Sequence, residues 1–423
     1  MTQLSSTITG MHILLIHQAF AGLHDAGGTR HFELAQFLVE KGHRVTIIAS
    51  QISYLSGKNE NKKPKWVIRE EPQAGIVVLK TYAYSGFHRS FIHRMLSFFT
   101  FMISSFYAGI RVKKVDLVWG TSPPIFQAWT AWLISWLKHV PFVLEIRDLW
   151  PAFAIAVGVL KNKILISLSE WLERFLYHHA ERVIVNSPGF IEHIKKQGAD
   201  KIDLIVNGVN PDMFNPTLDA SGWRHEHLLE GKFVVMYAGA HGLSNDLGVV
   251  LKAAKLLLND PEVAFVLVGD GKDKPKLMEQ AENLGLNNIT FLPSVAKSDM
   301  AITLAGCDAA IAILKPIEMY KLTYPNKVFD YMAAGRAVIL AIDGVIRQVV
   351  ESAGAGVFVP PGDADALAEA IRALQLDPDR CREMGIAGRR AVEVHFSRIN
   401  QADMLEKVFM EINCHPQNNI HRD

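Results

Sequence analysis

The fold of this chain follows from one stretch, MHILLIHQAFAGLHDAGGTRHFELAQFLVEKGHRVTIIAS, residues 11–50. Residues 11–20 open with an apolar run that is typical of a buried strand and end in a loop. Residues 26–43 start with glycines and carry apolar residues at helical spacing up to a final glycine, which predicts a helix. Residues 44–50 are a second apolar strand. The stretch is therefore a βαβ unit, and such units build parallel sheets whose ligands lie at the carboxyl ends of the strands.

The same alternation continues along the rest of the chain. Further strands of a first domain are predicted at residues 116–120, 142–146, 182–187 and 201–208. The segment 207–216, NGVNPDMFNP, is rich in Asn, Gly and Pro and predicts a linker. A second series of strands is predicted at residues 233–239, 263–270, 289–292, 309–314, 337–341 and 356–360. The predicted fold class is α/β, with two doubly wound, Rossmann-like domains that face each other across a cleft.

Length and composition agree with two domains. The chain has 423 residues, of which 49% are hydrophobic and 21% are charged, which is enough for two well-built cores. The net charge of +1 argues against a nucleic acid as partner. Three scattered cysteines, without metal-ligand spacing, fit a reducing cytosol. We expect neither a metal nor another cofactor, because no cluster of His, Asp and Glu has ligand spacing.

The boundaries of the predicted parts follow from these patterns. Residues 1–10 are interpreted as a disordered lead, since they lack the charge and the apolar core of a signal peptide. The other predicted parts are a first domain at 11–206, the linker at 207–216, a second domain at 217–396, an amphipathic helix at 397–413 and a polar tail at 414–423.

Two motifs of the second domain predict anion binding. In VGDGKDKPKL a strand runs into two glycines and then into a lysine-rich helix start, where Lys274 could hold a phosphate. In YPNKVFDYMAAGRAV, residues 324–338, Pro325 suits a first helical turn whose free N–H groups would face an anion. Asn326, Lys327 and Asp330 share one face of that helix, and a carboxylate one turn from a diphosphate can bind ribose hydroxyls. The alternatives are an ordinary βα turn for the first motif and, for Asp330, an acid that offsets the helix dipole.

The first domain carries polar residues at the carboxyl ends of its strands. Gly27, Gly28 and Thr29 begin the helix after the first strand and would form a second anion-binding helix start, unless they are only a cap and a flexible loop. The segment EIRDLWP places Arg147 and Asp148 where α/β ligands bind. His17 also follows a strand, although a single histidine is more often structural.

The sequence resembles the retaining glycosyltransferases of family 4, which have the GT-B fold. The resemblance covers nearly the whole chain and rests on five ordered motifs: GGTRHFELAQFLVEKGHRVTIIAS, VLEIRDLWP, VNGVNPDMFNP, VGDGKDKPKL and YPNKVFDYMAAGRAV. Within the family, the chain looks most like the bacterial subgroup that moves N-acetylated deoxyamino sugars, such as fucosamine, onto lipid-linked O-antigen or capsule precursors. The resemblance implies a nucleotide sugar in the second domain, an acceptor on the first, and a last helix that returns toward the first domain.

The resemblance also assigns roles to residues. It places Asp330 on the ribose, Lys274 on the diphosphate and Asp148 at the position from which many relatives contact the sugar. The family usually carries a second basic residue in the loop after the first strand of the second domain, and this loop offers His241 but no Arg or Lys. The glycines Gly239 and Gly242 would let the loop close over the transferred sugar or phosphate. Arg147 joins Gly27, Gly28 and Thr29 in the acceptor or phosphate loop, and His17 is a further catalytic candidate.

Leu322 marks a departure from the family. The family carries two glutamates separated by seven residues, and the first of them would stand at Leu322, which cannot act as a carboxylate. Glu318 is a candidate substitute, or the sugar lacks the hydroxyl in question; both residues are therefore candidates for sugar specificity.

The expected function is transfer of a sugar from a nucleoside diphosphate donor, with UDP expected, to a polyprenyl-diphosphate-linked saccharide. The family retains the anomeric configuration without a metal, and the leaving diphosphate accepts the proton of the acceptor. Two alternatives stay open at this point: a nucleotide-sugar epimerase of the same fold, and a non-catalytic nucleotide-sugar-binding subunit of a polysaccharide assembly complex.

Three uncharged stretches predict contact with a membrane. They are residues 95–110, residues 123–137 with three tryptophans on one helical face, and residues 149–160. The first has about 16 residues, fewer than the about 20 that a spanning helix needs. With nearby basic residues they predict a cytoplasmic protein that lies peripherally on the inner face of the plasma membrane. The alternative is that these helices are buried against the sheet.

Overall fold

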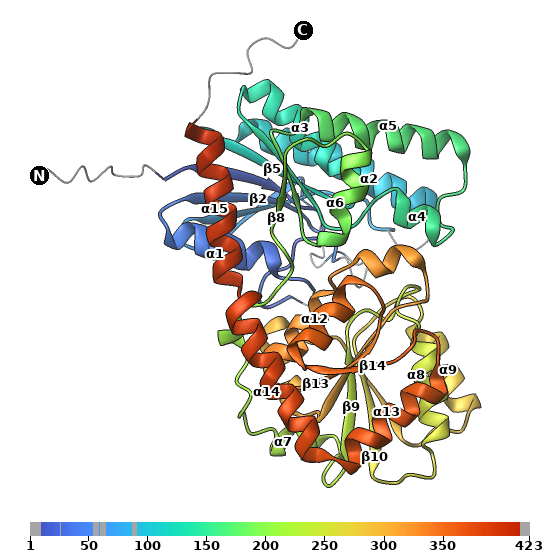
Figure 1. The fold of residues 1–423 in the computed structure, drawn as a ribbon. Helices are drawn as coiled ribbons and strands as arrows, with labels where there is room; N and C mark the ends of the chain where they lie inside the picture. Colours follow the sequence, from blue (N-terminus) through green and yellow to red (C-terminus); the bar gives the residue numbers. More distant parts are fainter. Residues whose placement is uncertain (1–9, 26, 54–58, 60–64, 87–90, 415–423) are drawn as a thin grey trace, which may run out of the picture.

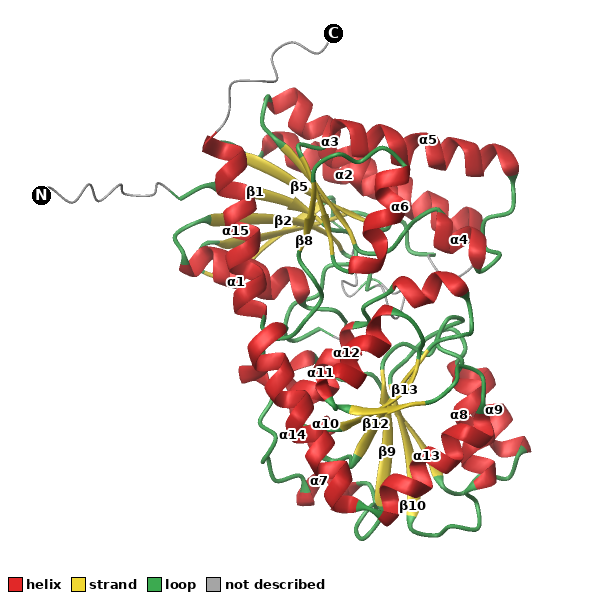
Figure 2. Cartoon of the chain, viewed as in Figure 1, coloured by secondary structure: helices red, strands yellow, loops and turns green. Residues whose placement is uncertain are grey.

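The computed structural model describes residues 10–25, 27–53, 59, 65–86 and 91–414. They form two α/β domains that are stacked end to end in Figures 1 and 2. The predicted lead at 1–10 and tail at 414–423 lie, except for Gly10 and Cys414, outside the described residues.

The first domain is built on an eight-stranded sheet of order β3-β4-β2-β1-β5-β6-β7-β8. Its strands are β1 (His12–Ile16), β2 (Arg44–Ser50), β3 (Val67–Gln73), β4 (Ile76–Thr81), β5 (Leu117–Ser122), β6 (Phe142–Ile146), β7 (Arg182–Val185) and β8 (Ile202–Leu204). All neighbours are parallel except the edge pair β3 and β4. This pair was not predicted, because the charges of β3 (VIREEPQ) hide the strand pattern.

Helices cover both faces of this sheet. The helices of this domain are α1 (Arg30–Glu40), α2 (Phe91–Arg111), α3 (Ile125–Lys138), α4 (Ala152–Ala156), α5 (Lys163–His179), η1 (Pro188–Phe190) and α6 (Ile191–Lys196). One face is covered by α1 and by α15 (Arg398–Cys414), the last helix of the chain. Helices α2, α3 and α5 cover the other face, where their inward side chains join the buried residues of the strands.

The second domain is a six-stranded parallel sheet of order β11-β10-β9-β12-β13-β14. Its strands are β9 (Phe233–Ala238), β10 (Val263–Val268), β11 (Ile289–Leu292), β12 (Ala309–Ile313), β13 (Ala337–Ala341) and β14 (Gly356–Phe358). Its helices are η2 (Pro211–Met213), α7 (Ser221–Glu226), α8 (Leu247–Leu256), α9 (Lys274–Asn283), η3 (Lys297–Asp299), α10 (Met300–Ala305), η4 (Glu318–Leu322), α11 (Asn326–Ala333), α12 (Val345–Ala353), α13 (Ala364–Leu376) and α14 (Pro378–His395). Helices α8, α9 and α13 pack on one face and α10, α11, α12 and α14 on the other.

The two domains touch through polar contacts near the strand ends. The Ser298 amide donates to the carbonyl of Leu23 at 3.2 Å, and Asn207 donates through Nδ2 to the carbonyl of Tyr324 at 2.6 Å. After α14 the chain returns to the first domain, where α15 packs along α1 (Figure 1). The prediction of two doubly wound domains with a returning last helix is therefore confirmed. Within the described ranges, no helix is long and apolar enough to cross a membrane.

Candidate functional site

The start of α11 faces the glycine loop of the first domain. Pro325 precedes the helix with extended backbone (φ −66°, ψ 127°), and no side chain caps the first turn. A Cβ atom added to Gly28 would lie 3.9 Å from Nδ2 of Asn326. The structure thus brings together two candidates from different domains, at a helix start whose N–H groups can receive an anion.

Lys327 lies in the first turn of α11 and points at the second domain's own sheet. Its Nζ donates to Oη of Tyr237 at 2.7 Å and to Oδ1 of Asn245 at 3.1 Å. It also lies 4.1 Å from the centre of the Tyr237 ring. Among the described residues it has no carboxylate partner, and the surrounding protein lowers the pKa of Lys327 to about 7.

Asp330 lies one turn further along α11 and is held by a lysine of η3. Lys297 Nζ is 2.6 Å from Oδ1 of Asp330, and both side chains are largely buried. Burial raises the pKa of Asp330 in spite of the opposing effect of Lys297. Lys297 was not predicted, because nothing in the exposed pattern of KSD indicates that this lysine turns inward.

The loops that follow β9 and β10 are packed backbone to backbone. Gly239 (φ +156°) and Gly269 (φ +145°) have conformations that favour glycine. A Cβ atom on Gly269 would lie 1.9 Å from the carbonyl oxygen of Gly239, and one on Gly271 2.4 Å from that of His241. Gly242, by contrast, is open, with Asn245 Nδ2 as its nearest neighbour at 4.0 Å.

His241 is fully buried between these loops, and neither of its ring nitrogens has a hydrogen-bond partner in the part of the chain that the structure describes. Burial, together with Lys274, lowers the pKa of His241 to about 4, so its ring is neutral at neutral pH. Lys274 Nζ donates to the carbonyls of Gly269 and Leu292 at 2.7 and 2.8 Å. In this structure Lys274 therefore joins the ends of β10 and β11.

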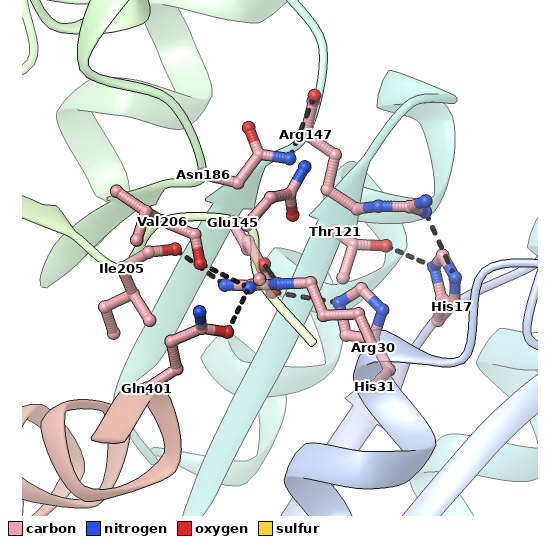
Figure 3. A network of polar contacts seen from close by, with 12 residues as sticks. His17, Arg30, His31, Thr121, Glu145, Arg147, Asn186, Ile205, Val206 and Gln401 are labelled. Atoms are coloured by element: carbon pink, nitrogen blue, oxygen red, sulfur yellow. Dashed lines mark hydrogen bonds and ion pairs between the residues drawn. The ribbon is translucent and has the colours of Figure 1, made fainter. Parts of the chain in front are cut away.

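A buried polar network lies at the carboxyl ends of β1, β5 and β6 (Figure 3). Glu145 accepts from Arg30 and from His31, both at 2.9 Å. Arg30 also donates to the carbonyls of Ile205 and Val206, so it ties α1 to the segment that leaves the first domain. Burial opposes ionisation of Glu145, but His31 and Arg30 together hold its pKa far below the usual range.

His17 is hydrogen-bonded within this network through both of its ring nitrogens. Its Nδ1 lies 2.8 Å from Oγ1 of Thr121, and its Nε2 lies 3.1 Å from Nη1 of Arg147. Since Arg147 can only donate, Nε2 must be the accepting nitrogen, which fixes the tautomer. Burial, and then His31 and Arg147, lower the pKa of His17 well below its ordinary value. His17 therefore orients Arg147, which is a positioning role, and a catalytic role of His17 stays a prediction.

Asp148 follows Arg147 and lies on the domain interface beside Tyr320. Asp148 has exposed surface, but desolvation of its carboxyl group by the surrounding protein raises its pKa to about 6, against the opposing charge of Arg147. Its charge acts on Tyr320, whose hydroxyl donates to Oγ of Ser244. Residues of both domains therefore gather around a carboxyl group that can gain or lose a proton near neutral pH.

Thr29 is hydrogen-bonded to a buried ion pair of the fold. Its hydroxyl donates to Glu33, which also pairs with Arg398 of α15 at 3.0 Å. Gly27 (φ +147°) is exposed, and a Cβ atom there would meet only Ala21 at 3.2 Å. Of the predicted loop, the two glycines remain accessible and the threonine is committed to the fold.

The two candidates for sugar specificity, Glu318 and Leu322, lie in η4 in different surroundings, and their role stays a prediction. Glu318 is 85% exposed at its side chain and pairs with Lys321 at 2.8 Å on the surface. Leu322 packs against the core of the first domain, and its carbonyl accepts from Ser187. A Cβ atom on Gly189 would lie 2.7 Å from Cα of Leu322. The apolar side chain of Leu322 therefore contributes to the contact between the two domains.

Comparisons with known proteins agree with this arrangement. Residues 26–208 match the family "Glycosyl transferase 4-like domain" and residues 221–391 match "Glycosyl transferases group 1". WcaI of Escherichia coli, a colanic acid biosynthesis glycosyl transferase by name, is 24% identical over 82% of this chain and 88% of its own length.

Solved structures show the same fold. Sucrose-phosphate synthase from Thermosynechococcus elongatus superposes with a TM-score of 0.76 at 19% identity, over 96% of this chain and 99% of its own. HepE of Anabaena, solved with UDP-glucose, superposes with a TM-score of 0.70 at 16% identity, over 95% of this chain and 100% of its own. The chain therefore has the GT-B fold of glycosyltransferases, with a glycosyl transferase 4-like domain followed by a glycosyl transferases group 1 domain.

Proposed function

We propose that this enzyme is a retaining, metal-independent transferase in bacterial surface polysaccharide synthesis. Its donor is a UDP-sugar, of which an N-acetylated deoxyamino hexose is the first candidate, and its acceptor is a polyprenyl-diphosphate-linked saccharide. The observation that carries the proposal is the uncapped start of α11, with Lys327 and Asp330 one turn apart and Gly28 opposite. The name of WcaI and the UDP-glucose bound to HepE support it.

Each part of the donor has a candidate partner. The first N–H groups of α11 and Lys327 would hold the diphosphate, and Asp330 would accept hydrogen bonds from the ribose hydroxyls. Lys274 remains a proposed diphosphate ligand only if it leaves the carbonyls of Gly269 and Leu292. Positive charge and N–H donors at this place stabilise a departing diphosphate, which is the main electrostatic demand of the reaction.

The acceptor side would be formed by the first domain. Arg147, oriented by His17, would hold an acceptor phosphate, and Asp148 would contact the transferred sugar or the attacking hydroxyl. In this mechanism the leaving diphosphate takes the proton of the acceptor hydroxyl on the same face of the sugar, so the configuration is retained without a protein nucleophile.

Turnover distinguishes this proposal from the other activities of the same fold. The protein is incubated with UDP-, dTDP- and GDP-sugars, with and without a lipid-diphosphate saccharide. Nucleotide release that requires the acceptor supports transfer. Sugar isomerisation without acceptor would indicate an epimerase, and tight binding without any turnover would indicate a binding subunit.

Substitution of Asp330 tests the donor site directly. Asp330→Ala is expected to weaken UDP-sugar binding about tenfold or more, because a charge-assisted hydrogen bond contributes about 1.5–3 kcal/mol. Asp365→Asn, on the exposed first turn of α13, is the matched control and should bind as the wild type does. Unchanged affinity of Asp330→Ala would remove Asp330 from the site.

We also propose that the outer face of α2, α3 and α5 lies on a lipid bilayer. The apolar helical surface consists of Ile92, Leu96, Phe99, Ile103, Tyr107 and Ile110 on α2, Trp136 and Leu137 on α3, and Ile164, Leu165, Leu168 and Trp171 on α5, all at least 40% exposed. The spacing of three and four residues places the α2 members on one stripe. Of the stretch 149–160 only Val159 is an exposed large hydrophobic residue, and α5 was not predicted to take part.

Charge around the apolar helical surface suits an anionic membrane. Neither α2 nor α3 contains an acidic residue. Exposed basic side chains stand at the helix ends, namely Arg111, Lys113, Lys114, Lys161 and Lys163. Apolar contact with flanking cations is the pattern of a helix that lies in the membrane interface.

Vesicle sedimentation tests this surface. Ile103→Glu and Leu168→Glu are expected to reduce co-sedimentation with phosphatidylglycerol vesicles, because each puts a charge into the apolar contact. Leu376→Glu, at a leucine that is 75% exposed on the second domain, is the control and should sediment like the wild type. Equal sedimentation of all variants, or release of the wild type by salt alone, would contradict the proposal.

A further inference from the structure

Lys327 is a lysine whose surroundings provide hydrogen bonds but no negative charge. Its ammonium has three N–H groups, and two of them are taken by Tyr237 Oη and Asn245 Oδ1. The Tyr237 hydroxyl gives its own proton to the carbonyl of Ala240 at 2.8 Å, so it can only accept from Lys327. One N–H of Lys327 is left for another acceptor.

The free side of Lys327 lies against Gly239. A Cβ atom at Gly239 would lie only 3.0 Å from Nζ of Lys327. Because glycine has no Cβ atom, no side chain at position 239 covers the ammonium group on this side. Three further polar atoms on two side chains are buried and have no hydrogen-bond partner among the described residues: Oδ1 of Asn326 and both ring nitrogens of His241. Unpaired buried polar atoms beside a lysine that has one N–H left indicate a place where a polar ligand completes the hydrogen bonds.

We propose that Lys327 is a protonation-dependent anion ligand: it is neutral without the donor and takes a proton from the solvent when the donor's diphosphate binds. The inference rests on the proposed donor site and adds the means by which charge is supplied there. Each diphosphate oxygen that approaches the third N–H of Lys327 favours the ammonium form, so binding of the anion and uptake of the proton promote each other.

We expect none of the other described titratable groups around Lys327 to supply this proton uptake. Tyr237, on β9, has its pKa raised well above its ordinary value by burial, and His241 is neutral above a pKa of about 4. Asp270 and Lys274, on the turn after β10, act on His241 with opposite signs. On α11 itself, Asp330 is paired with Lys297. Burial lowers the pKa of Lys327 to about 7.

The sign of the pH dependence follows. Above the pKa of about 7 the free protein holds Lys327 as a neutral amine, so a proton must be taken up on binding. Donor affinity is then expected to fall by up to about tenfold per pH unit as the pH rises above about 7, and to be level below it.

Calorimetric titration with UDP-glucose and UDP-N-acetylglucosamine tests the inference, since a sugar diphosphate diester does not itself titrate near neutrality. Measured at about pH 8 in two buffers of different ionisation enthalpy, binding should take up close to one proton. At about pH 5.5 the uptake should vanish. Lys327→Arg, which is always charged, should bind without uptake, and Lys327→Met should bind about tenfold more weakly at low pH.

Lys276→Met, at an exposed lysine of α9, is the matched control and should take up the same proton as the wild type. Wild-type binding without proton uptake would overturn the inference while leaving the proposed function intact, and so would wild-type uptake in Lys327→Arg. If no nucleotide sugar of the turnover panel binds at all, it is the proposed function that fails. Circular dichroism of each variant ensures that a loss of binding is not a loss of fold.

Discussion

At the scale of single residues, burial determines the charge of two neighbouring histidines in the first domain. The ring centres of His17 and His31 are 4.3 Å apart, and both side chains are inaccessible to solvent. Burial lowers the pKa of His31 to about 4, although Glu145 opposes the shift. Both rings are therefore neutral in the folded protein at a pH where an unfolded chain begins to protonate them.

This pair predicts a loss of stability in mild acid. Because the unfolded chain binds protons below about pH 6.5 and the folded protein does not, the free energy of unfolding should fall as the pH drops from about 6.5 toward 4, by up to about 1.4 kcal/mol per pH unit for each histidine. Urea unfolding at several pH values measures it. His31→Gln, which keeps a donor for Glu145, removes one titrating group and should flatten the slope; an unchanged slope would contradict the assignment.

Leu322 stands where the family resemblance places a glutamate, and its side chain packs between the domains instead of presenting a carboxylate. The residue lies in η4, next to Met319, and both side chains pack on the core of the first domain. A carboxylate there would be placed in an apolar contact without a partner. We expect other side chains near Leu322 to recognise the sugar. Candidates are Tyr320, Ser244 and Asp148, because the Tyr320 hydroxyl donates to Ser244 and interacts electrostatically with Asp148.

At the scale of elements, the loops after β9 and β10 depend on glycine. Gly269 carries a positive φ and touches the backbone of Gly239, so two strand ends approach more closely than side chains would allow. This contact places Gly239 beside Lys327 and encloses His241. The loop geometry therefore shapes the proposed donor site.

Gly269→Ala is expected to destabilise the protein by about 3 kcal/mol or more, because its Cβ meets a carbonyl oxygen and its φ is strained. Gly285→Ala is the matched control: Gly285 also has a positive φ (+64°) but no atom within 4 Å of an added Cβ. It should cost only about 1 kcal/mol. Chemical denaturation of both variants gives the comparison, and equal costs would show that crowding is unimportant.

At the scale of the whole molecule, a buried ion pair connects the last helix to the first domain. Arg398 pairs with Glu33 on α1, and its guanidinium also donates to the carbonyl of Gly208, where the chain leaves the first domain. Both side chains are 3% exposed. The pair therefore joins the outgoing segment, the returning helix and α1 at one point.

Removing one partner of this pair should cost more than removing both charges. Arg398→Met is expected to lower the free energy of unfolding by about 3 kcal/mol, since it leaves Glu33 buried and unpaired. Adding Glu33→Gln to Arg398→Met should recover part of that loss, with a coupling energy of about 2 kcal/mol in a double-mutant cycle. Strictly additive effects of the two substitutions would mean that the pair is not coupled.

The sequence by itself determined the two doubly wound sheets and the main candidate helix. Apolar runs of five residues between helical segments are local patterns, and each predicts a strand whatever lies beside it. Pro325 and the glycine stop of α11 are equally local signals. The charged edge strand β3 was missed, because its alternation is weak and its partner β4 determines it.

Only the tertiary structure decided which polar side chains meet. Lys297 reaches Asp330 from 33 positions away, and His17 reaches Arg147 from 130 positions away. Such pairs produce no periodic pattern in the sequence, because they depend on how the two sheets and their loops are placed in space. The sequence also could not show that Lys274 and Thr29, which it predicts as ligands, form hydrogen bonds within the protein. Lys327, in contrast, lies at the start of α11, where two of the three N–H groups of its ammonium are used.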